Sequence, residues 1–263
     1  MPEAPEIRIM SDFINQNAKD HQFSKLYHVE KGNNPVDANF ENFTVDSDFY
    51  GKQIQLKLTG KEELNISVFM GMSGNWKLVP TSSWSENKYT RMRLDRIDGM
   101  SLLLYGGYMG PKYKIGGFDT KRGFDLIKDF PKFKSKILSN IDAKVFDKPI
   151  CEVLLDQKYF DGVGNYIRST ILYYADVNPF EKARTVIKNK PDILELCQHV
   201  IQKSYELNGG QLRDWENPTP NLDSEEFHKW VFYSKGHSCV DGTKRTFWFD
   251  PKWDNNCPFD IKK

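Results

Sequence analysis

The sequence predicts an α+β protein, with a β-rich N-terminal domain followed by a helical C-terminal domain that carries a terminal β-hairpin. Two observations lead to this fold class. Between about residues 25 and 110, several segments alternate polar and apolar residues, as half-buried antiparallel strands do. Beyond residue 131 the apolar residues recur instead at the i, i+3 and i+4 spacing of helices. We therefore predict domains at residues 1–130 and 131–263.

A short amphipathic helix is predicted ahead of the first strand. Ile7, Met10, Phe13 and Ile14 lie at helical spacing within residues 5–19, so these four side chains would share one apolar face. The strands that follow are expected to be antiparallel. Residues 53–58 and 90–94 alternate most clearly, and Asp98-Gly99 is a hairpin turn signal between residues 91–97 and 100–105.

The C-terminal half predicts three helices and one hairpin. The helices are expected at residues 150–155, 166–174 and 193–207, and the last of them ends at Asn208-Gly209-Gly210. Residues 230–249 are rich in aromatic side chains and surround Asp241-Gly242, which predicts two strands joined by a turn.

The charge balance and the hydropathy argue against several classes of protein. The chain has 263 residues, with 37 Lys and Arg against 36 Asp and Glu, a formal net charge of +1. Its mean hydropathy is −0.62, and no apolar run approaches the roughly 18 residues that predict a membrane span. The start MPEAPE has no basic region or apolar core, so we expect no signal peptide. A strongly basic polyanion binder is disfavoured, and any basic face must be formed by folding.

The cysteines predict neither a disulfide framework nor a metal site. Cys151, Cys197, Cys239 and Cys257 are isolated, with no CxxC motif. His237, Cys239 and Cys257 give at most three scattered ligands, whereas a structural zinc site uses four. We expect reduced thiols, and neither a metal nor an organic cofactor.

The N-terminus offers a candidate nucleophile. Met1 precedes Pro2, a small residue whose initiator methionine is normally removed, which would expose a secondary amine. A terminal amine has a pKa of about 8, well below that of lysine, so part of it is unprotonated near neutrality. Its attack on an aldehyde-like carbon gives an iminium, and Glu3 and Glu6 are placed for proton transfer. On these residues alone, the simpler interpretation is a disordered start in which both glutamates cap the helix.

A glycine-containing turn joins two of the predicted helices. Gly162 and Gly164 would let backbone N–H groups converge on an anion, and Asn165 could add a side-chain donor to a phosphate. The alternative is a plain helical connection in which the glycines relieve strain.

Taken together, these motifs resemble the formamidopyrimidine-DNA glycosylase / endonuclease VIII family over nearly the whole chain. The segments that carry the resemblance are Pro2-Glu3-Ala4-Pro5-Glu6, similar to the PEGPE start; Gly51-Lys52, similar to the strand-borne lysine; Gly71-Met72-Ser73-Gly74, the GMSG turn; Leu154 to Tyr166, the helix–two-turn–helix motif; and Lys244 to Phe249, similar to the second strand of the finger hairpin. Asn178 to Arg184 is especially similar to the vertebrate endonuclease VIII-like branch whose finger lacks zinc.

The resemblance implies a two-layer β-sandwich behind the leading helix, then a helix–two-turn–helix domain with a zincless finger hairpin at about residues 228–252. DNA would lie in the cleft between the domains. Pro2 would be the nucleophile on C1′ of a damaged nucleotide, Glu3 would manage protons at the sugar, and Lys52 would pair with negative groups near the lesion.

The same resemblance assigns the DNA contacts. Asn165 and Arg245 would hold phosphates around the extruded nucleotide. Further contacts are implied for Glu6, Lys158 and the backbone of Gly164. Met72 would enter the helix as a wedge; its alternative role, a core methionine, is equally compatible with the sequence. For Lys52 and Arg245 the alternative is a solvated surface charge.

Three departures from the family pattern stand out. The usual D-x-R-R-F-G segment appears as residues 106–110, so the wedge arginine and aromatic residue become Tyr108 and Met109, and discrimination of the opposite base should be weak or altered. Thr170 occupies the position of a glutamate that helps organise the active site in relatives. The family's histidine before the GMSG turn is replaced by Phe69-Met70.

The resemblance therefore implies a bifunctional DNA glycosylase and AP lyase of base excision repair. It would remove oxidised pyrimidines, ring-opened purines and hydantoins through a Schiff base on Pro2, followed by β- or β,δ-elimination. The expected partner is damaged double-stranded DNA, and single-stranded or bubble DNA is a further candidate. A monomer located at DNA inside a cell is expected, be it in a nucleus, a bacterial cytoplasm or an infected cell. Two alternatives stay open: a degenerate damaged-DNA binding protein, and an AP lyase with weak base excision.

Overall fold

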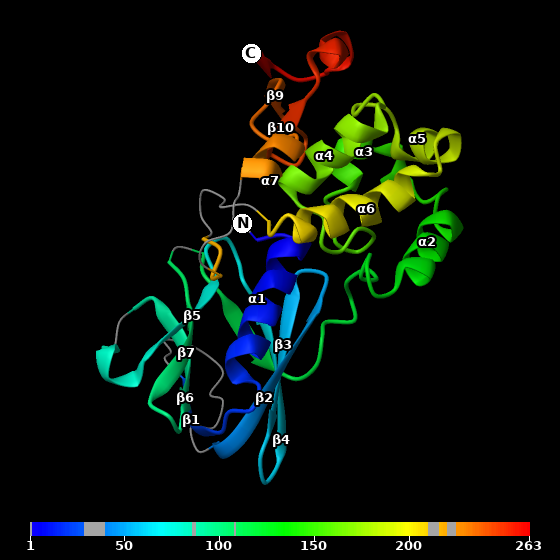
Figure 1. Cartoon of the computed structure of the whole chain (residues 1–263). Coiled ribbons are helices and arrows are strands. Elements are labelled where there is room, and N and C mark those ends of the chain that lie inside the picture. Colours follow the sequence, from blue (N-terminus) through cyan, green and yellow to red (C-terminus); the bar gives the residue numbers. More distant parts are fainter. Residues whose placement is uncertain (1, 29–39, 86–87, 108, 210–215, 220–224) are drawn as a thin grey trace. The chain divides into compact units, whose positions relative to one another are not determined.

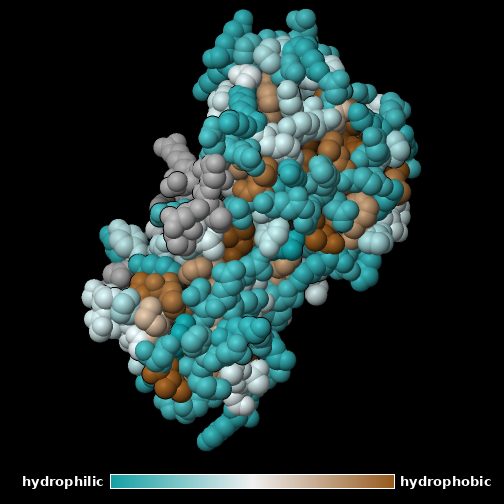
Figure 2. All heavy atoms as spheres, viewed as in Figure 1, coloured by the Kyte–Doolittle hydropathy of each residue, from teal (hydrophilic) through white to brown (hydrophobic). Residues whose placement is uncertain are grey.

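The structure is a computed structural model that describes every residue except 1, 29–39, 86–87, 108, 210–215 and 220–224 (Figure 1). The chain divides into two compact units. The first comprises Met1–Asp119 and Gly209–Leu222, and the second comprises Thr120–Asn208 and Asp223–Lys263. On the face drawn in Figure 2, hydrophilic residues predominate and the hydrophobic ones form small separate patches.

The described part of the first unit contains one α-helix and eight antiparallel strands. Their order in the sheet is β5-β7-β6-β1-β2-β3-β4-β8. The elements are α1 (Ala4–Ala18), β1 (Phe23–His28), β2 (Glu41–Tyr50), β3 (Gln53–Thr59), β4 (Glu63–Phe69), β5 (Asn75–Pro80), β6 (Thr90–Arg96), β7 (Met100–Tyr105) and β8 (Lys112–Ile115), with a 3-10 turn at Thr81–Ser83.

These strands form the two layers of a β-sandwich, β5-β7-β6-β1 and β2-β3-β4-β8. The layers are continuous through β1 and β2, where Phe23 pairs with Phe43 and their rings stack with centroids 5.6 Å apart. Ile54, Leu56 and Leu58 of β3 are fully buried, as their alternation with polar residues predicts.

The leading helix is confirmed, and it covers an apolar surface of this sandwich. α1 packs against β2 and also contacts β3 and β5 (Figure 1). Ile7, Met10, Phe13 and Ile14 are all buried, so the predicted face is the one that enters the core. The hairpin at Asp98-Gly99 is also confirmed, since β6 and β7 pair on either side of it.

The sequence predicts a half-buried strand at residues 90–94, but β6 is buried on both faces. Aromatic rings cover the face that carries its polar residues. Arg93 lies between the rings of Tyr27 and Trp84, 4.0 and 4.2 Å from their centroids. Its Nη2 donates to Asp95 Oδ2 at 2.9 Å. A guanidinium can be buried in this way because its charge is paired and its flat faces stack on aromatic rings.

The second unit is mainly helical. Its elements are α2 (Phe130–Ser139), α3 (Ile150–Val153), α4 (Asn165–Ala175), α5 (Ala183–Asn189), α6 (Ile193–Glu206), α7 (Glu225–Trp230), β9 (His237–Val240), β10 (Thr246–Phe249) and β11 (Ile261–Lys262), with 3-10 turns at Lys144–Asp147 and Pro251–Asn256. The three predicted helices correspond to α3, α4 and α6. β9 and β10 form the predicted hairpin, to which β11 adds a third strand beside β9.

The hairpin starts later than predicted. Trp230 belongs to helix α7, and the first strand begins at His237. Lys235 explains the difference, because its Nζ donates to the carbonyls of His228, Lys229 and Val231 and so ends the helix.

The compact units also differ in extent from the predicted domains. Residues 120–129 belong to the second unit, where Arg122 Nε donates to Asp161 Oδ2 at 3.0 Å. Glu216 belongs to the first unit, where its carbonyl accepts a hydrogen bond from Asn75 Nδ2 at 2.7 Å. Compactness does not test independent folding, so the domain limits of 1–130 and 131–263 stay a prediction. Among the helices that the structure describes, none is long and apolar enough to cross a membrane.

Candidate functional site

Pro2 is buried directly before the first helix. Glu3 is the N-cap of α1, and Glu3 and Glu6 together form a capping box. The backbone N–H of Glu3 donates to Glu6 Oε2 at 2.9 Å, and both side chains are buried. The capping role is therefore present in the structure, whereas a role in proton transfer stays a prediction. Pro2 also lies at the positive end of the helix dipole, which disfavours the protonated form of a terminal amine.

Gly209, which the sequence indicated only as a helix end, lies against this N-terminal cluster. Its φ is +59°, and a Cβ there would lie 2.8 Å from Glu6 Oε1 and 3.1 Å from Ile9 Cδ1. A side chain at this position would displace the Glu6 carboxylate. The resemblance also implies that the damaged base would bind in the loop between about residues 208 and 223, and most of this loop lies outside the described residues.

Lys52 lies in a tight turn between β2 and β3 rather than on a strand. Gly51 has a φ of +57°, a left-handed conformation that closes such a two-residue turn readily. Lys52 directly precedes β3, as the sequence pattern indicates, and its role at the lesion stays a prediction. The Lys52 side chain is half-buried in this turn.

Two of the predicted wedge residues lie side by side in the first unit. Met72 and Met109 are 37% and 58% exposed, and the backbone N–H of Met72 donates to the carbonyl of Met109 at 2.9 Å. Gly71 permits this contact, because a Cβ there would lie 2.2 Å from the Met109 carbonyl oxygen. The alternative of a core methionine does not hold for Met72. Tyr108, the third predicted wedge residue, lies outside the described residues.

The turn between α3 and α4 is braced by internal hydrogen bonds. The Gly162 N–H donates to Gln157 Oε1 at 3.3 Å, and the Val163 N–H donates to the Phe160 carbonyl at 3.2 Å. These two amides are thus already bonded within the turn. A phosphate contact would instead involve Gly164, which is the N-cap of α4. Lys158 is exposed on the same turn.

The structure brings the two predicted phosphate contacts of the second unit together. Asn165 begins α4, and its Nδ2 donates to the carbonyl of Thr246 at 2.7 Å. Thr246 follows Arg245, which is exposed in the loop between β9 and β10. The Asn165 Oδ1 accepts hydrogen bonds from Arg168, a residue that the sequence analysis did not single out. One arginine inside a helix gives no signal of burial or of a partner far away in the chain.

Thr170, which the resemblance aligns with a glutamate, makes structural hydrogen bonds in α4. Its hydroxyl donates to the Tyr166 carbonyl at 2.8 Å and accepts from the Phe232 N–H at 3.1 Å. The side chain therefore ties α4 to the chain that leaves α7, and it is fully buried.

Cys239 and Cys257 are the cysteines near the C-terminal hairpin. Among the residues that the structure describes, no group of three or more His, Cys, Asp or Glu side chains is arranged to hold a metal ion. His237 Nδ1 instead lies 2.9 Å from Asp254 Oδ1. Burial, with Cys257 beside it, raises the pKa of the Cys239 thiol to about 12.

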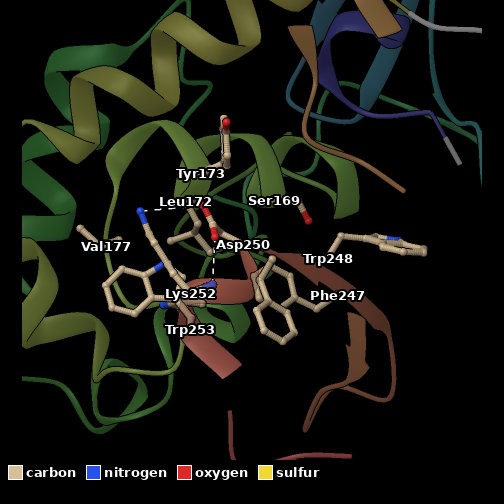
Figure 3. Close-up of a pocket in the computed structure, with 11 residues that line it drawn as sticks. Ser169, Leu172, Tyr173, Val177, Phe247, Trp248, Asp250, Lys252 and Trp253 are labelled. Atoms are coloured by element: carbon tan, nitrogen blue, oxygen red, sulfur yellow. Dashed lines mark hydrogen bonds and ion pairs between the residues drawn. The ribbon is translucent and has the colours of Figure 1, made fainter. Parts of the chain in front are cut away.

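One narrow pocket of the second unit lies between α4, β10 and the following 3-10 turn (Figure 3). Leu172, Phe247 and Trp253 form apolar parts of its wall, and Lys252 lies at one side, where it pairs with Asp176. None of the predicted site residues lines it.

Relatives of the chain include endonuclease 8-like proteins and formamidopyrimidine-DNA glycosylases. No family model matches the chain. Human endonuclease 8-like 1 is 29% identical over 284 residues, which cover 95% of this chain and 72% of the relative. Formamidopyrimidine-DNA glycosylase of Rhizorhabdus wittichii is 24% identical over 222 residues, 75% of this chain and 78% of the relative.

Solved structures share the fold. The crystal structure of the MutM (Fpg) protein from Thermus thermophilus has a TM-score of 0.78 at 18% identity and covers 98% of this chain and 100% of that one. Lactococcus lactis Fpg in complex with DNA that contains N7-benzyl-Fapy-dG has a TM-score of 0.77 at 16% identity, covering 96% and 99%. These likenesses confirm the predicted β-sandwich behind a leading helix. The chain is thus similar in sequence to endonuclease 8-like proteins and formamidopyrimidine-DNA glycosylases, and it shares the fold of the solved Fpg structures.

Proposed function

We propose that the protein is a bifunctional DNA glycosylase and AP lyase of base excision repair that acts on oxidised bases. The observation that carries this proposal is the N-terminal cluster. Pro2 is buried at the start of α1 beside the buried carboxylates of Glu3 and Glu6, in a chain that aligns over 95% of its length with an endonuclease 8-like protein.

The chemistry begins at the Pro2 nitrogen once Met1 has been removed. The secondary amine attacks C1′, the new N–C1′ bond forms, and the glycosidic bond breaks with its electron pair leaving on the base, which takes up the proton that the amine nitrogen releases. Cleavage of C1′–O4′, with a proton delivered to O4′ by Glu3, then gives the iminium. The iminium acidifies C2′, so loss of a C2′ proton expels the 3′ phosphate. A second elimination would expel the 5′ phosphate.

The remaining predicted residues hold the substrate. Lys52, Lys158, Gly164, Asn165 and Arg245 contact phosphates, and Glu6 supports the nucleophile. Met72, Tyr108 and Met109 fill the gap that the extruded nucleotide leaves. The substrate is damaged double-stranded DNA, with single-stranded and bubble DNA as further forms. The protein acts as a monomer at DNA inside the cell, and its chemistry uses no metal or organic cofactor.

Borohydride trapping tests the proposal. Oligonucleotides with an oxidised pyrimidine, a hydantoin, 8-oxoguanine or an abasic site are incubated with the protein and the reductant, on single- and double-stranded DNA. We expect a covalent protein–DNA band, strongest with oxidised pyrimidines, and an adduct mass that maps to Pro2. Absence of a band with every substrate would contradict enzymatic activity.

A blocked N-terminus is the control. Protein that retains Met1, or that carries an N-terminal tag, should bind DNA but give no adduct. Normal adduct yield from such a protein would implicate a lysine instead, with Lys52 as the first candidate. The adduct yields of Lys52→Met and of Lys61→Met, a substitution of an exposed lysine, are then compared. A loss in Lys52→Met alone would identify Lys52 as the nucleophile, whereas equal losses would reflect the lower positive charge.

A second candidate function is favoured by one observation. Thr170 replaces the glutamate of relatives and is used structurally, so base excision could be weak while the amine chemistry persists. A band with abasic DNA but none with damaged bases would identify an AP lyase. DNA binding without any band would identify a damaged-DNA binding protein.

A further inference from the structure

A fully buried arginine connects three segments of the second unit. Arg168 of α4 is 0% exposed. Its Nη1 donates to the Cys151 carbonyl of α3 at 2.8 Å and also pairs with Asp241 Oδ2 at the end of β9. The guanidinium carbon lies 4.8 Å from the centroid of Phe247 in β10. The guanidinium therefore contacts α3, the finger loop and the finger strand at once.

The other edge of the same guanidinium fixes Asn165. Its Nε and Nη2 donate to Asn165 Oδ1 at 3.0 and 2.6 Å. With its oxygen held there, the amide must turn its Nδ2 toward the finger, where one N–H donates to Thr246. The second N–H of that group is then the one that can reach a phosphate.

Asp241 organises the loop that carries Arg245. Its second oxygen, Oδ1, accepts from the Thr243 N–H at 2.9 Å, from the Thr243 hydroxyl at 2.6 Å and from the Arg245 N–H at 3.2 Å. Glu152 adds a bond from the other side, because its Oε1 accepts from the Gly242 N–H at 3.1 Å. Two carboxylates, Asp241 with three of these bonds and Glu152 with one, thus hold the loop from residue 241 to residue 245.

The Arg168–Asp241 ion pair is fully buried, and this bears on its role. A buried ion pair contributes little net stability relative to packed apolar residues, because both charges lose their hydration. Its geometry is nevertheless highly specific: the planar fork of an arginine can hold Asn165 on one edge and Asp241 on the other, whereas a lysine offers one point charge. The Arg168–Asp241 pair therefore fixes the position of Asn165 relative to the backbone of Arg245.

We propose that Arg168 and Asp241 are positioning residues that fix Asn165 and Arg245 as one preorganised grip on the DNA backbone. The proposal rests on the proposed function, because it assumes that Asn165 and Arg245 contact phosphates. Arg168 touches no substrate itself. It acts through the two residues whose spacing it sets, so that binding does not have to order the finger loop at that moment.

A double-mutant cycle on DNA binding tests the proposal. Arg168→Lys keeps the charge opposite Asp241 but loses the fork to Asn165. We expect it to weaken binding to abasic-site DNA about tenfold or more, the usual effect of losing a charge-assisted hydrogen bond. Asn165→Ala should weaken binding strongly in the native protein but little in the Arg168→Lys background. Additive effects of the two substitutions would overturn the proposal.

Two further measurements separate positioning from general stability. The slope of log affinity against log salt concentration should fall by about one in Asp241→Asn, because the Arg245 contact to a phosphate is lost. A lower melting temperature with unchanged affinity and salt slope would show a structural role only.

The matched control is Arg184→Lys. Arg184 also pairs with a carboxylate, Asp147, at 2.9 Å, but it lies far along the chain from the finger and is partly exposed. It should bind DNA normally. Native protein that binds abasic DNA but forms no adduct would contradict the proposed enzyme and still allow the cycle to be measured. Native protein that does not bind DNA would overturn both.

Discussion

The four thiols of the chain differ sharply in their surroundings. Cys151, Cys197 and Cys239 are buried, and Cys257 is partly exposed. Burial raises the pKa of Cys151 and of Cys197, and it raises the pKa of Cys239 to about 12. Because the thiolate is the reactive form, the three buried residues are both shielded and protonated near neutrality.

We therefore expect a maleimide to modify Cys257 in the native protein and to leave the other three cysteines intact. Peptide mass spectrometry after a short exposure at neutral pH measures the modified fraction at each site. Denatured protein, in which all four should react, is the control. Modification of Cys151 or Cys197 at a rate similar to that of Cys257 would show that the second unit opens readily.

Gly209 is a second residue with a specific physical requirement. A Cβ would meet Glu6 Oε1 at 2.8 Å, and Glu6 cannot withdraw without losing its bond to the Glu3 N–H. We expect Gly209→Ala to lower the free energy of unfolding by about 1–3 kcal/mol, the usual effect of a strained left-handed residue, and to slow Schiff-base trapping.

Gly99→Ala is the matched control for that substitution. Gly99 also has a positive φ, of +85°, but a Cβ there meets nothing within 4 Å. Urea denaturation of both variants separates backbone strain from the contact with Glu6. Equal losses of stability, with equal trapping rates, would show that the Glu6 contact has no effect of its own.

At the scale of elements, the finger loop should make folding depend on pH. Burial alone raises the pKa of Asp241, but the Arg168 charge and the hydrogen bonds from Thr243, Arg168 and Arg245 outweigh it, so the pKa of Asp241 is lowered. The charged and titratable groups that face Asp241 are Arg168 of α4, Glu152 and Cys151 of α3, Cys239 of β9 and the loop residue Arg245.

The lowered pKa sets the direction of this dependence. A carboxyl whose folded pKa lies below its unfolded value of about 3.9 contributes stability above that pH, and the contribution is lost as pH falls through the folded pKa. We expect the free energy of unfolding to fall below about pH 4. Asp241→Asn should remove this part of the pH dependence and cost about 3–5 kcal/mol near neutrality, since Arg168 is left buried without a counter-charge.

Urea denaturation between pH 7 and pH 3 checks this. Asp142→Asn is the matched control, because the pKa of Asp142 is also lowered, by Lys188, but at an exposed site where an ion pair has little effect on stability. An unchanged pH profile in Asp241→Asn would contradict the assignment.

A helix or strand could be predicted from the sequence where its pattern of apolar residues fits only one type of element. The apolar face of α1 and the alternation in β3 have a single interpretation, and both were correct. The aromatic run after Trp230 fits a helix end as well as a strand, and it was decided by the contacts of Lys235 with three carbonyls. Those contacts depend on where the chain turns, which no local pattern specifies.

In the candidate site too, the residues within local motifs could be predicted, whereas the contacts between distant residues could not. The individual residues Asn165 and Arg245 could be identified from motifs, because each motif is local. Their meeting through Thr246, and the buried link through Arg168 and Asp241, could not be. An interior ion pair between residues 73 positions apart is formed by tertiary packing, and a charged residue in a helix looks like a surface residue in the sequence.

At the scale of the whole molecule, the charge of +1 limits how DNA can be held. A weak overall field gives little long-range attraction, so binding depends on a few placed cations. With Lys52, Lys158 and Arg245 as the proposed phosphate partners, the slope of log affinity against log salt concentration should be about −3. Fluorescence anisotropy from low to physiological salt measures it. A slope of about −8 would mean that an extended basic surface, unidentified so far, makes contact.

The return of Gly209–Leu222 to the first unit has a further consequence for the covalent connectivity. The polypeptide passes from one unit to the other three times, after residues 119, 208 and 222. A single proteolytic cut after residue 208 or 222 therefore leaves residues 1–119 covalently joined to the second unit, whereas a cut after residue 119 leaves only residues 209–222 of the first unit joined to it. Conversely, a fragment that ends at residue 130 lacks a segment that its own sheet binds through Asn75. Each unit is compact by itself, but the two are interleaved along the chain.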